Sequence, residues 1–193
     1  MNQNVVVQKV GISPLLINRY RGEQLPRPKP KVKTEAWIES ERKRKWIDAA
    51  HFEDGMFALP PIMIEGAVYK AAAAFRKGKD FKMAVMCADL SVPILVNRGN
   101  GKYLPLKGEV EDFYVPEFID LRGCPNKAGQ MVEQCRPIFR DWSVEFTLQY
   151  DDSLVDAKEI RQACEGMILG SFRPRFGRCS LKEFQVMKVS KVA

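Results

Sequence analysis

The residues best suited to chemistry lie near the C-terminus, in the segment Gly170-Ser-Phe-Arg-Pro-Arg-Phe-Gly-Arg178. Arginine offers a forked set of donors for phosphate and a flat face for stacking, while phenylalanine offers a platform for an unpaired base. A left-handed glycine after a helix and a second glycine before the last strand would present these side chains from a short turn. The alternative is a surface loop with solvated arginines and buried rings. The segment predicts a nucleic-acid-binding loop with these side chains: Phe172, Arg173, Arg175, Phe176 and Arg178.

Basic residues are also concentrated earlier in the chain. The net charge is +7, and residues 19–45 hold ten Lys or Arg against four Glu, which is nearly the whole excess. Such an excess predicts attraction to polyanions. Solvated surface cations are the alternative, especially on a helix. Two further groups are assigned to the same binding role: the block Arg42, Lys43, Arg44 and Lys45, and the cations of a central helix and its end, Lys70, Arg76, Lys77 and Lys79.

The sequence predicts neither a metal site nor a catalytic set. The five cysteines form no CxxC pair and their odd number argues against a disulfide framework. His51 is the only histidine, so a general base at neutral pH would act without a second histidine. The carboxylates Asp151, Asp152 and Asp156 are interpreted as turn and capping residues. We therefore expect no cofactor, no metal and no enzymatic activity.

Length and composition indicate one domain of ordinary size. The chain has 193 residues, of which 46% are hydrophobic, so it can bury a core. No apolar run approaches the roughly 18 residues that cross a membrane, and the N-terminus does not resemble a signal peptide. The expected location is therefore a reducing cytoplasm, that of the host if a phage encodes the chain.

Several elements are expected to position these side chains in the first half of the chain. A strand at 5–11, rich in β-branched residues, resumes at 15–17, and a proline-spaced basic arm at 19–33 is expected to be mobile without a partner. Thr34 is expected to cap a helix at 35–50. Asp54-Gly55 predicts a hairpin, and apolar residues at spacings of three and four predict a helix at 62–77.

The second half begins with an insertion of irregular strands at 87–129. The segments 131–139 and 142–150 are then expected to form a hairpin, because the second of them alternates apolar and polar residues. A helix at 154–169, entered through a capping box of Ser153 and Asp156, and a strand at 178–189 complete the chain.

The order of elements without the insertions is strand, helix, strand, strand, helix, strand. This order predicts the fold class α+β, with a ferredoxin-like or RRM-like βαββαβ core, a basic N-terminal insertion and a central β-rich insertion. The single domain 1–193 is divided into a core (1–18, 51–86 and 130–193), a basic arm and helix (19–50) and the β insertion (87–129). In RNA recognition motifs the sheet face without helices binds single strands, so the same face is expected to be free here.

Two motifs resemble those of the RAMP superfamily, the backbone proteins of CRISPR effector complexes. The segment Leu59-Pro-Pro-Ile-Met-Ile-Glu-Gly-Ala-Val-Tyr-Lys-Ala-Ala is similar to their helix entry, and 170–178 resembles their glycine-rich loop. Together with Gly11-Ile-Ser-Pro-Leu-Leu-Ile-Asn18 and the Trp142 strand, these motifs resemble small uncharacterised bacteriophage proteins of that kind. The resemblance implies a modified RNA recognition fold, contact with the backbone of a single strand, and protomers stacked along it.

The main hypothesis is non-catalytic, sequence-tolerant binding of single-stranded RNA or DNA through the basic arm, the 170–178 loop and the cationic end of the central helix. The protein is expected to be phage-encoded, with a homo-oligomer or filament along the strand as a further expectation. The loop holds fewer glycines than that of the family, which favours a stand-alone protein over a subunit of a CRISPR-type complex. One alternative is a phage protein-interaction module that inhibits or imitates a CRISPR backbone subunit. The second alternative is a ribonuclease of the RAMP type.

Overall fold

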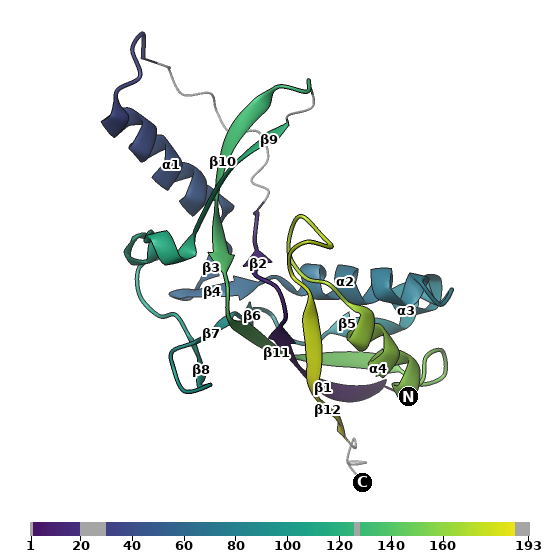
Figure 1. The fold of residues 1–193 in the computed structure, drawn as a ribbon. Helices are drawn as coiled ribbons and strands as arrows, with labels where there is room; N and C mark the ends of the chain where they lie inside the picture. The colour runs from purple at the N-terminus through teal and green to yellow at the C-terminus, as the bar shows by residue number, and fades with distance from the viewer. Residues whose placement is uncertain (1, 20–29, 126–127, 188–193) are drawn as a thin grey trace.

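An antiparallel sheet with helices on one face forms the centre of the molecule (Figure 1). The computed structural model describes residues 2–19, 30–125 and 128–187. The strands of the main sheet follow the order β12-β1-β11-β7-β8, and β5 also pairs with β11. Their bounds are Asn2–Gly11 for β1, Val85–Cys87 for β5, Leu95–Asn97 for β7, Tyr103–Pro105 for β8, Trp142–Asp151 for β11 and Cys179–Met187 for β12.

The helices on the covered face connect the strands of this sheet. Helix α2 (Pro61–Ala73) and the short α3 (Gly78–Ala84) lead from the N-terminal half into β5, and α4 (Ala157–Gly166) leads from β11 to β12. The elements β1, α2, β5, β11, α4 and β12 therefore reproduce the βαββαβ order, with β1 and β11 adjacent in the sheet. The predicted α+β, ferredoxin-like fold class is confirmed.

The alternation of side chains along the strands decides which face is buried. In β1 and β11 the apolar residues that pair across the strands, such as Val7 and Phe146, are buried beneath the helices. Cross-strand partners share a face. On the opposite face Gln8 lies between Glu145 and Glu183, and among the described residues of β1, β11 and β12 no aromatic side chain lies there. A face without stacking rings and with two carboxylates does not provide the platform that the RNA recognition motif uses.

A second sheet projects from the first as a ribbon. Its strands follow the order β2 (Leu15–Leu16), β10 (Met131–Phe139) and β9 (Ile119–Pro125), and α1 (Glu35–Ala49) lies beside β10 (Figure 1). The predicted hairpin of 131–139 with 142–150 is therefore wrong, because β10 pairs with β9 and β2 while β11 pairs with β1. The strand that completes the core is β5, at the edge of the predicted insertion.

A small third sheet contains the predicted Asp54-Gly55 hairpin. It consists of β3 (Phe52–Glu53), β4 (Met56–Leu59) and β6 (Val92–Pro93). Asp54 and Gly55 have φ angles of 51° and 72°, as a two-residue turn with two left-handed positions requires. Between β8 and β9 the chain forms two 3₁₀ turns, Val110–Phe113 and Pro116–Phe118, where the sequence suggested an extended piece.

The ends of the helices agree with the predictions at one point and differ from them at two. Thr34 caps α1 as expected, because its hydroxyl accepts a hydrogen bond from the Trp37 amide at 3.2 Å. Helix α2 ends earlier than predicted, since Arg76 adopts a φ of 66° that stops the helix before α3 begins. The capping box of α4 is formed by Asp156 and Glu159, not by Ser153 and Asp156.

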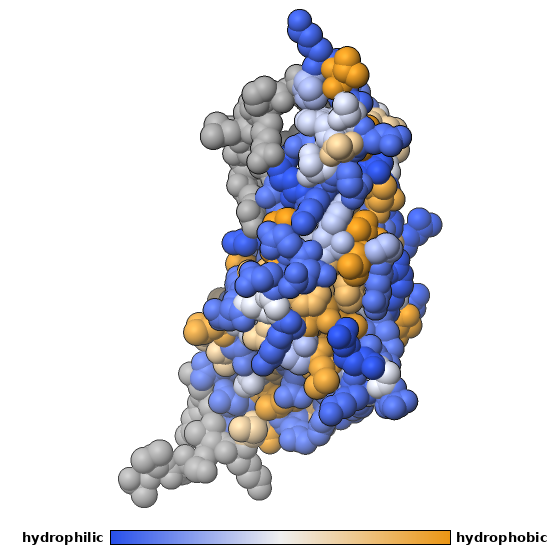
Figure 2. Space-filling model, turned by 90° about the vertical axis from the view of Figure 1, so that its left-hand side faces the viewer, coloured by the Kyte–Doolittle hydropathy of each residue, from blue (hydrophilic) through white to orange (hydrophobic). Residues whose placement is uncertain are grey.

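The surface that carries α1 is predominantly hydrophilic. Figure 2 shows apolar side chains there only in small groups between polar ones. In the part of the chain that the structure describes, no helix is long and apolar enough to cross a membrane. Most of the predicted basic arm, 20–29, and the last six residues lie outside the described residues.

Candidate nucleic-acid interface

The outer side of α2 is built from small residues. Ile64 and Val68 point into the core, which leaves Gly66, Ala73 and Ala74 at the surface. After the turn at Arg76, α3 returns close to α2, because Gly78 has no side chain to contact Ala73. An open hollow of about 790 Å³ results, called the α2–α3 hollow, with the lining residues Gly66, Tyr69, Lys70, Ala73, Arg76, Gly78, Lys79 and Lys82.

Four of the residues that line the α2–α3 hollow are cations, and none is acidic. Lys70, Arg76, Lys79 and Lys82 are exposed. Within the described residues none of these four side chains forms an ion pair, so their donors face solvent. Because the floor is made of glycine and alanine, an extended anionic chain can approach α2 closely.

Lys77 differs from the other predicted cations of this helix end. Its ammonium group lies 3.2 Å from Glu159 of α4 and 3.4 Å from Asp80. The hydrogen bond to Glu159 is the main cause that raises the pKa of Lys77. Lys77 therefore ties α4 to the start of α3 and points away from the α2–α3 hollow.

A second hollow connects α2 with the 170–178 loop. It encloses about 370 Å³ and has a mostly apolar lining of Ala67, Ala71, Ala74, Gly166, Ile168 and Pro174, together with Lys70 and Arg173. Arg173 donates a hydrogen bond to the carbonyl oxygen of Ile168 at 3.2 Å. Since Lys70 lines both hollows, the two form one cationic surface from α3 to the loop, which we call the α2 surface.

The 170–178 loop is fixed by its backbone rather than projecting freely. The amide of Ser171 donates to the Leu16 carbonyl at 2.7 Å, and the amide of Gly177 donates to the Pro14 carbonyl at 2.8 Å. Gly170 and Gly177 have φ angles of 71° and 75°, and a β-carbon at either would collide with backbone. The predicted left-handed conformation of Gly170 is confirmed, but Gly170 follows the helix by several residues and serves close packing against Leu16 instead of ending the helix.

The two phenylalanines of this loop have different environments. Phe176 is 8% exposed and packs with Leu16 and Ile138, and the guanidinium of Arg122 lies 4.6 Å from its ring centre. Phe172 is 44% exposed, and one side of its ring is covered by the guanidinium of Arg136, also at 4.6 Å. Only Phe172 can stack an incoming base without unfolding part of the loop.

Arg175 and Arg178 are exposed at the end of the loop. The backbone of Arg178 is bound to the 12–13 segment, since its carbonyl accepts from Ile12 and its amide donates to the Ser13 hydroxyl at 3.0 Å. Their side chains have no hydrogen-bond partner among the described residues, and both lie further along the loop at which the α2 surface ends.

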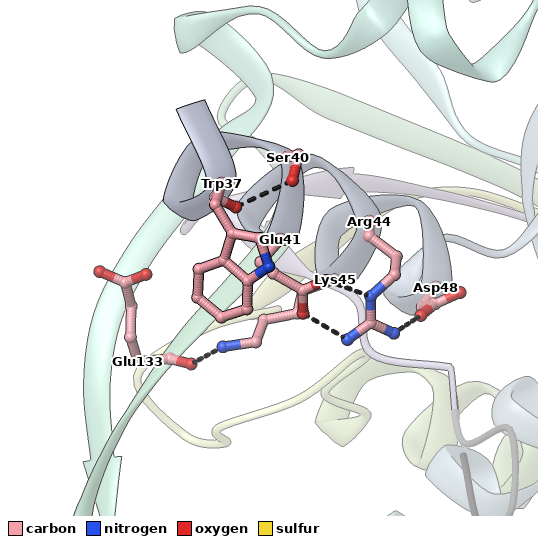
Figure 3. A network of polar contacts seen from close by, with 7 residues as sticks. All are labelled: Trp37, Ser40, Glu41, Arg44, Lys45, Asp48 and Glu133. Carbon is pink, nitrogen blue, oxygen red and sulfur yellow. Dashed lines mark hydrogen bonds and ion pairs between the residues drawn. The ribbon is translucent and has the colours of Figure 1, made fainter. Parts of the chain in front are cut away.

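The block at 42–45 is largely used inside the protein. Arg42 donates to both carboxylate oxygens of Glu133, at 3.0 and 2.8 Å, and these bonds raise its pKa and lower that of Glu133. Lys45 donates to the Glu133 carbonyl at 2.9 Å, and Arg44 binds Glu41 and Asp48 (Figure 3).

Arg42 and Lys45 thereby fasten α1 to β10, whereas the ion pairs of Arg44 lie within α1. Lys43 is the one member of the block without a partner among the described residues, so it is the member best placed to bind a ligand. The assignment of the block to nucleic acid remains a prediction.

Several residues of the candidate interface were missed by sequence reasoning. Lys82 lies three positions after Lys79 on a helix that was not predicted, and Arg122 and Arg136 lie on strands whose pairing was not predicted. The spacing of Lys79 and Lys82 could have placed both on one helix face. His51 lies at the start of the third sheet, and burial lowers the pKa of its imidazole. Within the described ranges, no cluster of His, Cys, Asp and Glu could hold a metal ion.

The fold and the cationic surface of α2 define the class of this protein as an α+β, RRM-like domain with a basic face. No family model matches the chain, and no curated protein matches it. Among solved structures it is similar to a chain in the cryo-EM structure of the Type III-B Cmr-beta bound to cognate target RNA. The TM-score is 0.57 at 12% identity, and the match covers 97% of this chain and 61% of that one. The likeness therefore concerns the fold, and this chain spans about three fifths of the other's length.

Proposed function

We propose that the protein binds single-stranded nucleic acid along the α2 surface without cleaving it. One observation carries the proposal: exposed cations follow one another from Lys82 through Lys70 to Arg173 over a floor of small residues, with no carboxylate among the lining residues. A run of unpaired cations fits a phosphate backbone and carries no base information, so binding is expected to tolerate changes of sequence.

The similar solved structure supports the proposal at the level of the fold. That structure contains target RNA, and its chain shares the arrangement of sheet and helices with this one. The resemblance of residues 59–72 and 170–178 to RAMP motifs supports a CRISPR-related context for this binding, which is part of the proposal. Protomers that bind side by side would cover a long strand, which mass measurements on short and long oligonucleotides can test.

The decisive experiment reverses charges on the α2 surface. In the α2 variant, Lys70, Arg76 and Lys79 are changed to Glu, and binding to labelled 12-nucleotide oligo-uridine and oligo-deoxythymidine is followed by fluorescence anisotropy. We expect a loss of affinity of at least tenfold, because three attractive contacts become repulsive.

A matched control changes net charge equally at a distant place. Arg98, Lys102 and Lys107 lie on or next to the β7–β8 hairpin, are exposed, and have no ion pair in the described part of the chain. Changing these three residues to Glu is expected to weaken binding much less. Equal effects of the two variants would show that only net charge matters, and the proposed surface would then be wrong.

Catalysis is tested separately, because single-strand binding and cleavage are different functions. The protein is incubated with end-labelled RNA, with and without divalent metal, and the RNA is separated by length. Intact RNA at stoichiometric protein is the expected result. Discrete cleavage products that disappear in the α2 variant would favour a ribonuclease instead.

A further inference from the structure

A second group of cations lies where the ribbon meets the 170–178 loop, outside the two hollows of the α2 surface. In the ladder of β9 and β10, Asp120 pairs with Arg136. Because side chains alternate along a strand, Arg122 projects on the same face as these two. Phe172 and Phe176 of the loop cover the two guanidinium groups. We call this place the ribbon–loop seam.

The two arginines of the seam have unequal partners. Arg122 donates to both carboxylate oxygens of Asp120, one of them at 2.6 Å, and these bonds raise its pKa. Asp120 is itself 8% exposed. The single buried carboxylate of the seam is therefore occupied by Arg122.

Arg136 has no such partner. It is 7% exposed, and neither Nε nor Nη1 has a hydrogen-bond acceptor. Burial lowers the pKa of its guanidinium, against the opposing effects of Cys124 and Asp120, while Arg122 adds repulsion. Arg136 also has a side-chain hydrogen bond with Cys124, but that thiol leaves Nε and Nη1 unsatisfied. A buried cation with two unsatisfied donors is unfavourable, and such groups in native proteins call for a missing partner.

The environment of Arg136 specifies the missing partner. The ring of Phe172 lies over one face of the guanidinium, so the donors point along the plane of the group, where a tetrahedral anion is bound in a forked manner. Phe172 is a non-glycine residue with a φ of 55°, a conformation that persists where the surroundings impose it. Phe172 is 44% exposed, so part of its ring is accessible to a ligand at the seam.

We propose that Arg136 is an anion-binding residue of the ribbon–loop seam and takes a phosphate group, with Phe172 as a movable cover. The phosphate can belong to a nucleic-acid strand or be free. With a strand, the guanidinium holds the phosphate and the outer side of the Phe172 ring stacks an adjacent base. This site adds to the function proposed above and is tested independently of it.

The test uses Arg136→Met, which keeps the length of the side chain and removes the charge. Removing a buried unpaired charge in favour of an apolar side chain is expected to leave the Tm unchanged or raise it. The matched control is Arg122→Met, which leaves Asp120 unpaired and is expected to lower the Tm while keeping the response to anions.

Thermal melts are recorded with sodium pyrophosphate and with 12-nucleotide oligo-uridine, in the wild type and in the α2 variant. At ten times its Kd, a ligand that binds the folded state raises the Tm of a chain of this size by about 3 to 6 °C. We expect the pyrophosphate response to persist in the α2 variant and to be lost when Arg136→Met is added to it. A response to oligo-uridine alone, lost in Arg136→Met, identifies the strand as the source of the phosphate.

Two results would overturn the proposal. One is an Arg136→Met protein that responds to both ligands as its parent does. The other is an Arg136→Met protein with a lowered Tm and an unchanged anion response, which would make Arg136 a clamp for the loop. Failure of the α2 surface shows itself differently, as unchanged oligonucleotide affinity of the α2 variant.

Discussion

Phe172 and Phe176 occupy opposite ends of the range of burial in one short loop. Each follows or precedes an arginine in the sequence, so the local pattern treats them alike. Residues from distant strands give the two rings different environments. Leu16 and Ile138 enclose Phe176, whereas Phe172 contacts Arg136 and remains 44% exposed. Local sequence could therefore indicate the stacking chemistry of this loop but not which ring performs it.

Substituting each ring separates stacking from packing. Phe172→Ala is expected to weaken oligonucleotide binding by about 1 to 3 kcal/mol with little change in stability, because an exposed stacking ring acts only in the complex. Phe176→Ala is expected to lower the free energy of unfolding by about 3 to 5 kcal/mol, because it empties a packed site. One denaturant titration and one binding titration per variant decide this. A Phe172→Ala protein that is strongly destabilised and binds normally would contradict it.

Lys9 is a fully buried amine in the core. It is 0% exposed, and its Nζ donates to the Cys164 carbonyl, 2.7 Å away, at the end of α4. Burial lowers the pKa of Lys9. Burial also raises the pKa of Cys87 and of Cys135 to about 11, and that of Cys164 to about 12. These shifts have opposite consequences for stability at alkaline pH.

Stability at alkaline pH is expected to reflect both groups. The folded protein binds the proton of Lys9 less tightly than the unfolded chain does. The destabilisation caused by burying Lys9 therefore decreases as the pH rises toward its ordinary pKa of about 10.4. The thiols hold their protons more tightly when folded, so their contribution is full below about pH 8.5 and is lost as the pH rises through their folded pKa values. The free energy of unfolding of wild type minus that of Lys9→Met should therefore increase between pH 7 and 10. A constant difference, measured by denaturant titration, would contradict this.

The predictions were correct for helix caps and turns that depend on neighbouring residues, and they were wrong for elements that depend on partners distant in the sequence. The Thr34 cap and the Asp54-Gly55 turn are fixed by hydrogen bonds and φ angles within a few residues. The strand 131–139 was paired wrongly because alternation states which face is buried and not which strand lies alongside. The end of α2 was missed because Arg76 adopts a left-handed conformation that sequence patterns assign to glycine.

The break between α2 and α3 gives a prediction that joins stability to binding. Arg76→Gly is expected to raise the free energy of unfolding by about 0.5 to 1 kcal/mol, because glycine adopts a positive φ without steric cost. The same change removes one cation of the α2 surface and should weaken oligonucleotide binding. Arg76→Ala is the matched control, since it loses the charge but keeps the strained conformation. If Arg76→Gly and Arg76→Ala are equally stable, the turn is not strained.

Across the whole molecule, the cations fall into two groups: those exposed to solvent on the α2 surface and those that form contacts inside the protein around α1. The predicted cations at 70–79 and in the 170–178 loop are brought together by the packing of α2 against α4, which no local pattern specifies. Within the block at 42–45, Arg42 is instead paired with Glu133, and Arg44 with Glu41 and Asp48. Net charge alone therefore predicted a polyanion partner, whereas only the fold distinguishes cations that face solvent from those that hold α1.

The dependence of binding on salt concentration measures how many of the exposed cations contact a bound strand. Each phosphate neutralised on a single strand contributes about −0.7 to the slope of log affinity against log salt concentration. Five exposed cations line the hollows of the α2 surface, Lys70, Arg76, Lys79, Lys82 and Arg173, and two more exposed cations, Arg175 and Arg178, lie further along the loop. If all seven contact phosphates, the slope for a 12-nucleotide strand is expected to be about −5.

Removing cations from different surfaces tests which of them contribute to that slope. Changing Arg173 and Arg175 to Ala should reduce its size by about 1.4. Changing Lys31 and Lys33 to Ala removes the same charge from the segment that leads into α1, a helix on the other side of the molecule from α3 (Figure 1), and should leave the slope nearly unchanged. Anisotropy titrations between low and moderate salt measure both. Equal slopes for the two double variants would mean that the strand is attracted by net charge and follows no defined path along α2.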